Sequence, residues 1–330
     1  MSEMHEAQYY EKLPDHKVAC HLCPQECKIA PGRAGFCGFR RNINGVLRAE
    51  LYGKVAAVQM DPIEKKPLYH FHPGADILSV GTNGCNFRCQ WCQNWHLSDG
   101  RASLQNTSSE EIVATAKQHR SMGIAYTYNE PLVWYEFVLD CAQAARDQGM
   151  VNVLVTNGFI NPEPLVKLLP LVDAMNIDLK AIQPEVYKRH CKGQLEPVQH
   201  TIRKAANACH VELTNLIVTG VNDSREDIEA LVDFVASVDK TIPLHFSRYF
   251  PNFNFDAPPT PETTIRMAYE IGAAKLDYVY VGNINLAGAS DTACPSCGNT
   301  LVTRTGYRTR VVDVRDGRCG KCGFQPNFVW

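Results

Sequence analysis

The sequence predicts an α/β protein whose body is a partial (β/α)6 barrel of TIM type, flanked by two small cysteine-rich modules. Three observations predict this architecture. Strand-like and helix-like segments alternate from Asp76 onward, polar residues recur where the predicted strands end, and most cysteines gather in three groups. We therefore expect an N-terminal Cys-rich module over residues 1–60, the barrel over 61–285 and a zinc-ribbon-like module over 286–330.

Short apolar runs alternate with amphipathic helical patterns through the predicted barrel and give six strand and helix pairs. Ser108 or Ser109 is suited to cap the first helix, and Gly149 to end the second. The predicted strands are "DILSVGT", "GIAYTYNEP", "VNVLVTNG", "AMNIDLKA", "HVELTNLIVTG" and "IPLHFSRYF", and the predicted helices include "SEEIVATAKQHR", "WYEFVLDCAQAARDQG", "PEPLVKLLPLV", "SREDIEALVDFVASV" and "PETTIRMAYEIGAAKL". This alternation favours parallel pairing, which leaves a barrel or an open doubly wound sheet.

Polar or charged residues follow five of the predicted strands, and they favour the barrel. They stand in "TNGC", "YNEP", "TNG", "IDLK" and "HFSRYF". Any one of them could be an ordinary turn or helix cap. In a barrel, however, the carboxyl ends of the strands converge on one mouth, where side chains from several strands face a single ligand.

The composition argues against several classes of partner. Lys and Arg total 33 against 35 Asp and Glu, a formal net charge of -2, so we expect neither nucleic acid nor an anionic membrane surface as partner. The start, "MSEMHEAQYYEKLPDHK", is polar and unlike a secretory signal, and no apolar run approaches the length of a membrane span. We expect a cytoplasmic protein.

Fourteen cysteines in a cytoplasmic chain indicate metal binding or catalysis, because that compartment keeps thiols reduced. Cys141, Cys191 and Cys209 stand alone in the sequence, and an isolated cysteine is by default a small buried apolar residue. We assign no chemistry to these three. The remaining cysteines form a front, a central and a terminal group.

The central group, Cys85, Cys89 and Cys92 in "TNGCNFRCQWCQNW", supplies three thiolates and leaves one metal position open. Zinc and a [4Fe-4S] cluster are the competing groups. Catalytic zinc usually includes His or carboxylate among its ligands, whereas a soft all-thiolate site favours iron and sulfide. The spacing therefore favours a cluster whose fourth iron binds a small molecule.

The stretch "GCNFRCQWCQNW" resembles the radical S-adenosylmethionine (SAM) enzymes. The resemblance implies that SAM chelates the open iron through its amino and carboxylate groups. It also implies reductive cleavage of SAM to methionine and a 5′-deoxyadenosyl radical, with a flavodoxin or ferredoxin as electron donor. On this resemblance Cys85, Cys89 and Cys92 carry the catalysis.

Further positions are implied by the same resemblance. "YNEP" is similar to the GGEP-type turn that binds the methionine ammonium, which implicates Asn129 and Glu130, although the glycines are absent here. Trp91 matches a position where an aromatic ring lies near adenine, and a packed core aromatic is the alternative.

"VTNG" and "NIDLK" resemble strand ends of glycyl-radical-enzyme activating proteins such as the pyruvate formate-lyase activator. That likeness implies that ribose, the methionine carboxylate or a nearby cation is held by Thr156, Asn157, Asp178 and Lys180. A purely structural ion pair is the alternative for Asp178 and Lys180.

Two later strand ends supply the last candidates for SAM binding. "HFSRYF" offers Arg248, with His245 nearby, as a bidentate clamp for a carboxylate. "LIVTGVND" loosely resembles a motif that packs on adenine, which implicates Val218 and Gly220.

The two outer cysteine groups are candidate metal sites. Cys294, Cys297, Cys319 and Cys322 form two CxxC pairs separated by a strand-like stretch, a zinc-ribbon pattern that closes the coordination shell; a rubredoxin-like iron site or an auxiliary cluster is the alternative. Cys20, Cys23, Cys27 and Cys37 stand in a loop-like stretch and could hold either zinc or a second iron-sulfur cluster.

The whole pattern resembles the radical SAM enzyme of the AmmeMemoRadiSam system, a homologue of the pyruvate formate-lyase activator. This likeness implies Memo-like and AMMECR-like proteins as partners. Three functions are weighed: hydrogen abstraction from a peptide or protein, such as a glycine; the same radical chemistry on a small metabolite; and, more distantly, a non-catalytic zinc-binding interaction protein.

Overall fold

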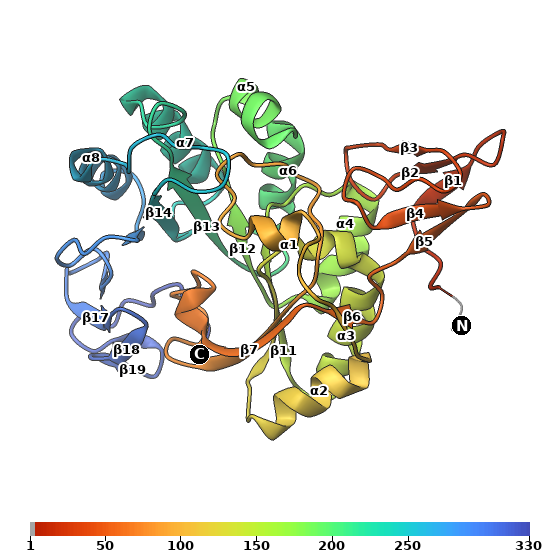
Figure 1. The fold of residues 1–330 in the computed structure, drawn as a ribbon. Helices are drawn as coiled ribbons and strands as arrows, with labels where there is room; N and C mark the ends of the chain where they lie inside the picture. Colours follow the sequence, from red (N-terminus) through yellow and green to blue (C-terminus); the bar gives the residue numbers. More distant parts are fainter. Residues whose placement is uncertain (1–3) are drawn as a thin grey trace.

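A curved eight-stranded sheet forms the body of the protein, which we describe from a computed structural model covering residues 4–330. Residues 1–3 of the predicted N-terminal module lie outside that range. The strands in spatial order are β15 (Val279–Gly282), β14 (Leu244–Arg248), β13 (His210–Ile217), β12 (Ala174–Asp178), β11 (Val151–Thr156), β10 (Gly123–Tyr126), β8 (Asp76–Gly81) and β7 (Ala57–Pro62). The sheet and its covering helices confirm the predicted α/β architecture (Figure 1).

Neighbouring strands from β8 to β15 are parallel and follow chain order, as expected for repeated strand and helix units. The sheet has two strands more than the sequence predicted. β15 adds a seventh parallel strand, and β7 pairs antiparallel with β8 and crosses the predicted module boundary at residue 60. β15 escaped prediction because "VYVG" is too short to carry a periodic signal.

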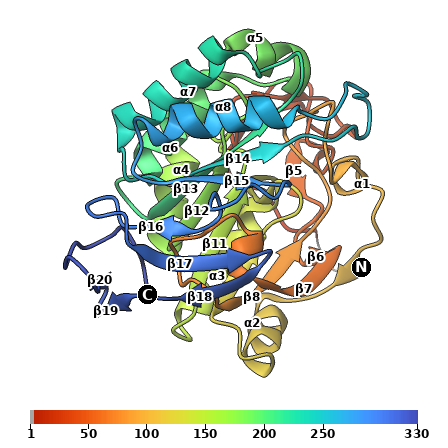
Figure 2. The same cartoon turned by 90° about the vertical axis from the view of Figure 1, so that its left-hand side faces the viewer.

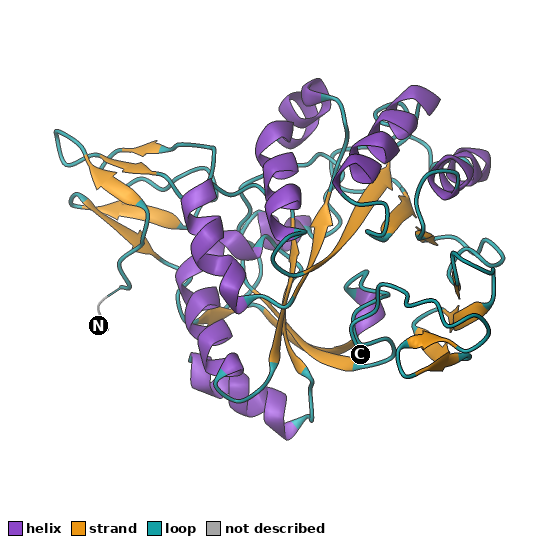
Figure 3. Ribbon diagram, turned by 180° about the vertical axis from the view of Figure 1, so that it is seen from behind, coloured by secondary structure: helices purple, strands orange, loops and turns teal. Residues whose placement is uncertain are grey.

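Helices cover the outer face of the sheet, while loops and the ends of the strands remain at its edges (Figure 3). The covering helices are α2 (Ser109–Gln118), α3 (Tyr135–Arg146), α4 (Pro162–Leu168), α6 (Leu195–Ala205), α7 (Arg225–Val238) and α8 (Glu262–Ala273). Ser108 caps α2 with a reciprocal bond to Glu111. The sequence pattern did not predict α6, which holds Pro197 in its first turn, where the missing N–H is not needed.

A chain segment that precedes β8 closes the inner face of the sheet at its lower end, which is the end where the parallel strands begin. Ile63, Leu68 and Phe71 pack against Ile77 at the start of β8 and against the early residues of the next strands, Ala125, Val153 and Ala174. All seven side chains are fully buried. A ligand on the inner face must therefore approach from the carboxyl ends of the strands.

Two small modules lie on opposite sides of the barrel (Figure 1, Figure 3). The N-terminal one contains the sheet β1 (Tyr10–Lys12), β2 (Val18–Cys20) and β3 (Lys28–Ile29) and the hairpin of β4 (Arg40–Ile43) with β5 (Val46–Ala49). The C-terminal one contains β16 (Thr292–Ala293), β17 (Thr300–Thr305) and β18 (Arg308–Val311), with β19 (Val314–Arg315) paired to β20 (Arg318–Cys319) (Figure 2). Short pairing of β6 (Lys54–Val55) with β9 (Gln105–Asn106) completes the strands.

Several short helical turns occupy the loops. They are η1 (Ile63–Lys65), α1 (Trp95–Ser98), η2 (Pro131–Trp134), η3 (Leu169–Leu171), α5 (Pro184–Val186) and η4 (Tyr187–Cys191), the last with π-helical bonding. Within residues 4–330, the helices are all too short or too polar to cross a lipid bilayer.

Candidate active site

The loop that carries the central cysteines leaves the carboxyl end of β8 and is fastened to the end of β10. Asn129 accepts a hydrogen bond from the Thr82 N–H at 3.0 Å, and its amide donates to the carbonyls of Asn83 at 3.2 Å and Gly84 at 3.0 Å. Gly84 has a φ of 88°, and a Cβ there would lie 2.7 Å from the Phe39 ring. The loop therefore needs glycine just before Cys85.

The three thiols of the loop are half-buried. Burial raises the pKa of Cys85 well above its ordinary value and raises that of Cys92 as well, so neither ionises readily without a cation. The Asn157 amide lies 3.8 Å from the Cys85 sulfur, and the Ser98 hydroxyl lies 3.4 Å from the Cys92 sulfur. Such thiols become good thiolates when a metal binds them.

Glu130 sits at the end of β10 with its carboxylate turned to β11. It accepts hydrogen bonds from the Thr156 hydroxyl at 2.7 Å, the Asn157 N–H at 2.7 Å and the Leu132 N–H at 3.1 Å. Burial still outweighs these bonds and raises the pKa of Glu130 to about 7. The structure thus joins Asn129, Glu130, Thr156 and Asn157 in one connected set beside Cys85.

Asp178 and Lys180 lie together at the end of β12. The Lys180 ammonium is 2.7 Å from the Asp178 carboxylate. Burial lowers the pKa of Lys180, but the Asp178 carboxylate outweighs that effect and holds it above its usual range. Both charges act on the Cys89 thiol, which places the pair next to the cysteine loop.

Cys191, a cysteine for which the sequence predicted no chemistry, interacts with the Cys89 thiol. The π-helical turn η4 ends at Cys191, whose carbonyl accepts from the Arg88 N–H at 2.8 Å. A hydrogen bond with Cys191, followed by burial, raises the pKa of Cys89. Nothing in the sequence signals this contact, because Cys191 lies about a hundred residues from the loop it touches.

Three residues were predicted to lie near the adenine of SAM, and the structure places them as follows. Trp91 is buried, with its ring 5.6 Å from those of both His190 and Phe255. Val218 is buried beside Asn222, whose amide donates to the Lys180 carbonyl, whereas Gly220 lies in a turn with a φ of 74°.

Arg248 and His245 point away from each other. The Arg248 guanidinium donates to the Thr260 carbonyl at 2.8 Å, outside the sheet. His245 faces inward and lies 2.6 Å from the buried carboxylate of Glu212. A role for Arg248 at the ligand stays a prediction.

The terminal cysteines Cys294, Cys297, Cys319 and Cys322 converge on one point. Their sulfurs all lie within 4.8 Å of one another, with Cys294 to Cys322 at 3.6 Å and Cys297 to Cys319 at 3.7 Å. Tetrahedral ligands at the usual Zn–S distance of about 2.3 Å would be about 3.8 Å apart. The group fits a single metal ion in a C-terminal module.

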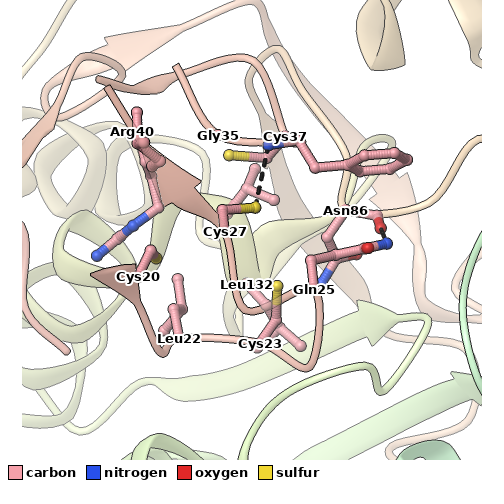
Figure 4. A pocket seen from close by; sticks show the side chains of 13 residues that line it. Cys20, Leu22, Cys23, Gln25, Cys27, Gly35, Cys37, Arg40, Asn86 and Leu132 are labelled. Carbon is pink, nitrogen blue, oxygen red and sulfur yellow. Dashed lines mark hydrogen bonds between the residues drawn. The ribbon is translucent and has the colours of Figure 1, made fainter. Parts of the chain in front are cut away.

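The front cysteines Cys20, Cys23, Cys27 and Cys37 line one cavity, together with Asn86 of the central loop (Figure 4). The remaining lining is mostly apolar and includes Leu22, Ile29, Leu132 and Val133. The structure therefore brings all four front cysteines to one place, against the loop that bears Cys85.

The residues at the barrel mouth fit a thiolate-bound cluster with a small charged cosubstrate. Three soft ligands on one loop suit iron and sulfide. The Asn83 side-chain oxygen is buried and has no hydrogen-bond partner among residues 4–330, so it is free to accept from a ligand. A parallel barrel with a thiolate-held group at its mouth defines a class of metal-dependent enzyme.

Comparison with known proteins identifies that class. The sequence profile of the radical SAM superfamily matches residues 79–235, and the chain belongs to this superfamily. Membership implies a [4Fe-4S] cluster and SAM as cofactors.

Three relatives and one fold show how far the likeness extends. An uncharacterized protein of Methanocaldococcus jannaschii is 46% identical over 335 residues, covering 99% of this chain and 100% of that one. The pyruvate formate-lyase 1-activating enzyme of Escherichia coli K12 is 29% identical over 123 residues, covering 35% of this chain and 50% of its own. The (2S)-3-sulfopropanediol dehydratase activating enzyme of Klebsiella oxytoca is 27% identical over 114 residues, 34% of this chain and 36% of its own. Streptococcus suis SuiB bound to its precursor peptide SuiA shares the fold, with a TM-score of 0.50 at 12% identity over 67% of this chain and 51% of that one.

Proposed function

We propose that this radical SAM enzyme holds its cluster on Cys85, Cys89 and Cys92 and directs the 5′-deoxyadenosyl radical at a protein or peptide, with glycine as the target residue. One observation carries the site: the cysteine loop, Glu130 and the Asp178–Lys180 pair meet at the carboxyl ends of β8, β10 and β12. When the cluster and SAM are bound, they supply reductive cleavage to methionine and a radical that abstracts hydrogen.

The chain's own residues bind and orient the cosubstrate in this proposal. Glu130, fixed by Thr156 and Asn157, faces the methionine ammonium, while Lys180 offers a positive charge to the carboxylate or ribose. Asn129 holds the cysteine loop against the end of β10. Trp91, Val218 and Gly220 are proposed to form the adenine side of the site, with Arg248 as a more distant clamp.

A protein substrate is supported by two considerations. The lower end of the inner face is filled by Ile63, Leu68 and Phe71, so a substrate meets the radical at the mouth, where a loop of another protein can be presented. The curated relatives from Escherichia coli and Klebsiella oxytoca are activating enzymes by name. Proposed partners are a flavodoxin or ferredoxin as electron donor and, by likeness to the AmmeMemoRadiSam system, Memo-like and AMMECR-like proteins.

The radical chemistry is tested by 5′-deoxyadenosine formation. Anaerobically reconstituted protein with dithionite and SAM is expected to form this product, and Cys89→Ala is expected to abolish it. Cys191→Ala is the matched control, because its thiol touches Cys89 but is not among the three proposed ligands. Equal product from Cys89→Ala and the wild type would contradict the assignment.

The substrate is tested by deuterium transfer. A lysate from cells grown on deuterated glycine is separated into macromolecules and a low-mass filtrate, and each is incubated with the enzyme. Deuterium in 5′-deoxyadenosine from the macromolecular fraction alone supports a protein glycine. Deuterium from the filtrate alone, after general deuterium labelling, would instead support the small-metabolite alternative.

A further inference from the structure

The four front cysteines reach their common cavity from separate turns of the N-terminal module. Cys20 ends β2, Cys23 and Cys27 lie in the loop that leads to β3, and Cys37 precedes β4. Figure 4 shows their sulfurs arranged around the same space. The Cys20 N–H donates to the Cys27 carbonyl at 2.9 Å, which fixes two of the four ligands across the strand pair.

The spacing of these thiols differs from that of the terminal group. Within residues 4–330, Cys294, Cys297, Cys319 and Cys322 are the one set of three or more metal-binding side chains drawn together closely enough for a single ion. The front thiols line a cavity without meeting at one point, and the thiols of Cys85, Cys89 and Cys92 do not meet at one point either. A cubane keeps its thiolates farther apart than one ion does, because four irons lie between them.

Polar groups around the front cavity are arranged to receive negative sulfur. The Phe36 N–H donates to the Cys27 sulfur at 3.3 Å. Arg40, only 2% exposed, lines the cavity, and its Nη1 atom donates to the Glu136 carboxylate at 3.0 Å, whereas its Nε atom is buried without a hydrogen-bond partner in the described chain. An unpaired buried donor of this kind is costly unless a ligand meets it.

The cavity is also in direct contact with the loop of the central cysteines. Gln25 donates through its amide to the Asn86 carbonyl at 2.9 Å, and the Arg88 guanidinium donates to the Phe36 carbonyl. Asn86, which follows Cys85 in the chain, lines the front cavity. The front cavity and the central cysteine loop are therefore in contact through Asn86, the residue next to the proposed cluster ligand Cys85.

We propose that Cys20, Cys23, Cys27 and Cys37 bind a second [4Fe-4S] cluster and not zinc. With four thiolates its irons are all ligated by protein, so it does not bind SAM and acts as an electron carrier. One electron enters from an external ferredoxin or flavodoxin and passes to the central loop's site, and no bond is made or broken. The carrier role rests on the proposed function, whereas the metal site does not.

The test removes the central site and leaves the front one. The full-length variant Cys85→Ala/Cys89→Ala/Cys92→Ala, reconstituted anaerobically, is expected to retain about four irons and four sulfides per chain. Dithionite should produce an electron paramagnetic resonance signal that SAM does not alter. Adding Cys23→Ala and Cys27→Ala should remove this iron. The wild type should hold about eight irons, and Cys209→Ala, which lies outside all three groups, should match it.

Each outcome decides the proposal. About four irons with two zinc ions in the wild type would overturn it, whatever the variants do. A triple variant that keeps its circular dichroism spectrum but contains zinc alone would overturn it too. Failure of the proposed function would look different, because 5′-deoxyadenosine would be missing while the iron of the front site remained.

Discussion

Asn129 and Gly84 are joined by a hydrogen bond of 3.0 Å between the Asn129 amide and the Gly84 carbonyl. The same side chain accepts from the Thr82 N–H, so it satisfies backbone groups on both sides of the loop's first turn. The position occupied by glycine in the GGEP-type turn thus carries, in this protein, a side chain that fastens the cysteine loop to the end of β10.

Asn129→Ala is expected to loosen the cysteine loop. The change leaves the Thr82 N–H and two carbonyls without partners, at a cost of about 1–3 kcal/mol for each buried group left unsatisfied. Iron retained per chain after gel filtration should fall, and thermal unfolding of the apoprotein should shift downward. Asn207→Ala, at an exposed position just after α6, is the control and should change neither. Full iron retention by Asn129→Ala would show that the clamp is dispensable.

Asp178→Asn is expected to weaken SAM binding while the cluster remains. The substitution removes the carboxylate that orients Lys180 at 2.7 Å, a charge-assisted contact worth about 1.5–3 kcal/mol, or roughly 10- to 100-fold in dissociation constant. Equilibrium binding of SAM to the unreduced protein measures the effect. Asp277→Asn removes a surface partner of Lys240 at 3.2 Å and serves as the control. An unchanged dissociation constant for Asp178→Asn would assign the pair a structural role.

Glu130 should make the stability of the apoprotein depend on pH. Burial raises the pKa of Glu130 from 4.5 to about 7, so between these values the folded chain keeps a proton that the unfolded chain has released. Stability from this group is therefore greatest below pH 4.5 and declines as pH rises through about 7, by roughly 3 kcal/mol.

Urea unfolding of apoprotein across this pH range tests the effect. Glu130→Gln should flatten the pH dependence, whereas Glu229→Gln, on the exposed face of α7, should leave it as in the wild type. A Glu130→Gln curve parallel to the wild-type curve would mean that the carboxylate is ionised at all these pH values.

Local sequence patterns predicted most of the barrel but not the contacts that join distant segments. The strand and helix periods of β8 to β14 were readable because each buries a regular face. Ser108 was readable as a cap because its partner lies three residues away. The contacts of Cys191 with Cys89 and of Asn86 with the front cavity could not be predicted, because each joins segments that are far apart in the sequence. The His245 side chain points inward and the Arg248 side chain outward because they lie on opposite faces of β14. The motif "HFSRYF" alone did not predict which face is which.

The C-terminal module should support the lower end of the barrel. The Val329 N–H donates to the His70 carbonyl at 2.8 Å, and the Val329 carbonyl accepts from the His72 N–H at 2.7 Å. Arg304, on β17, donates to the Tyr69 carbonyl at 2.7 Å and lies over the Tyr69 ring. The segment that fills the barrel is thus held from outside by the module whose four cysteine sulfurs lie within 4.8 Å of one another.

Cys319→Ala should therefore act at a distance from the radical site. We expect the variant to lose one zinc ion per chain, because three thiolates no longer close the coordination shell. Amide hydrogen exchange should quicken at Tyr69, His70 and Phe71, whereas the iron content of the barrel should stay unchanged. Tyr307→Ala, an exposed residue in the turn between β17 and β18, is a control that should retain zinc and slow exchange. Loss of zinc without faster exchange in the buried segment would show that the fold of the barrel does not depend on the module. Loss of iron in place of zinc would show that the terminal cysteines bind iron.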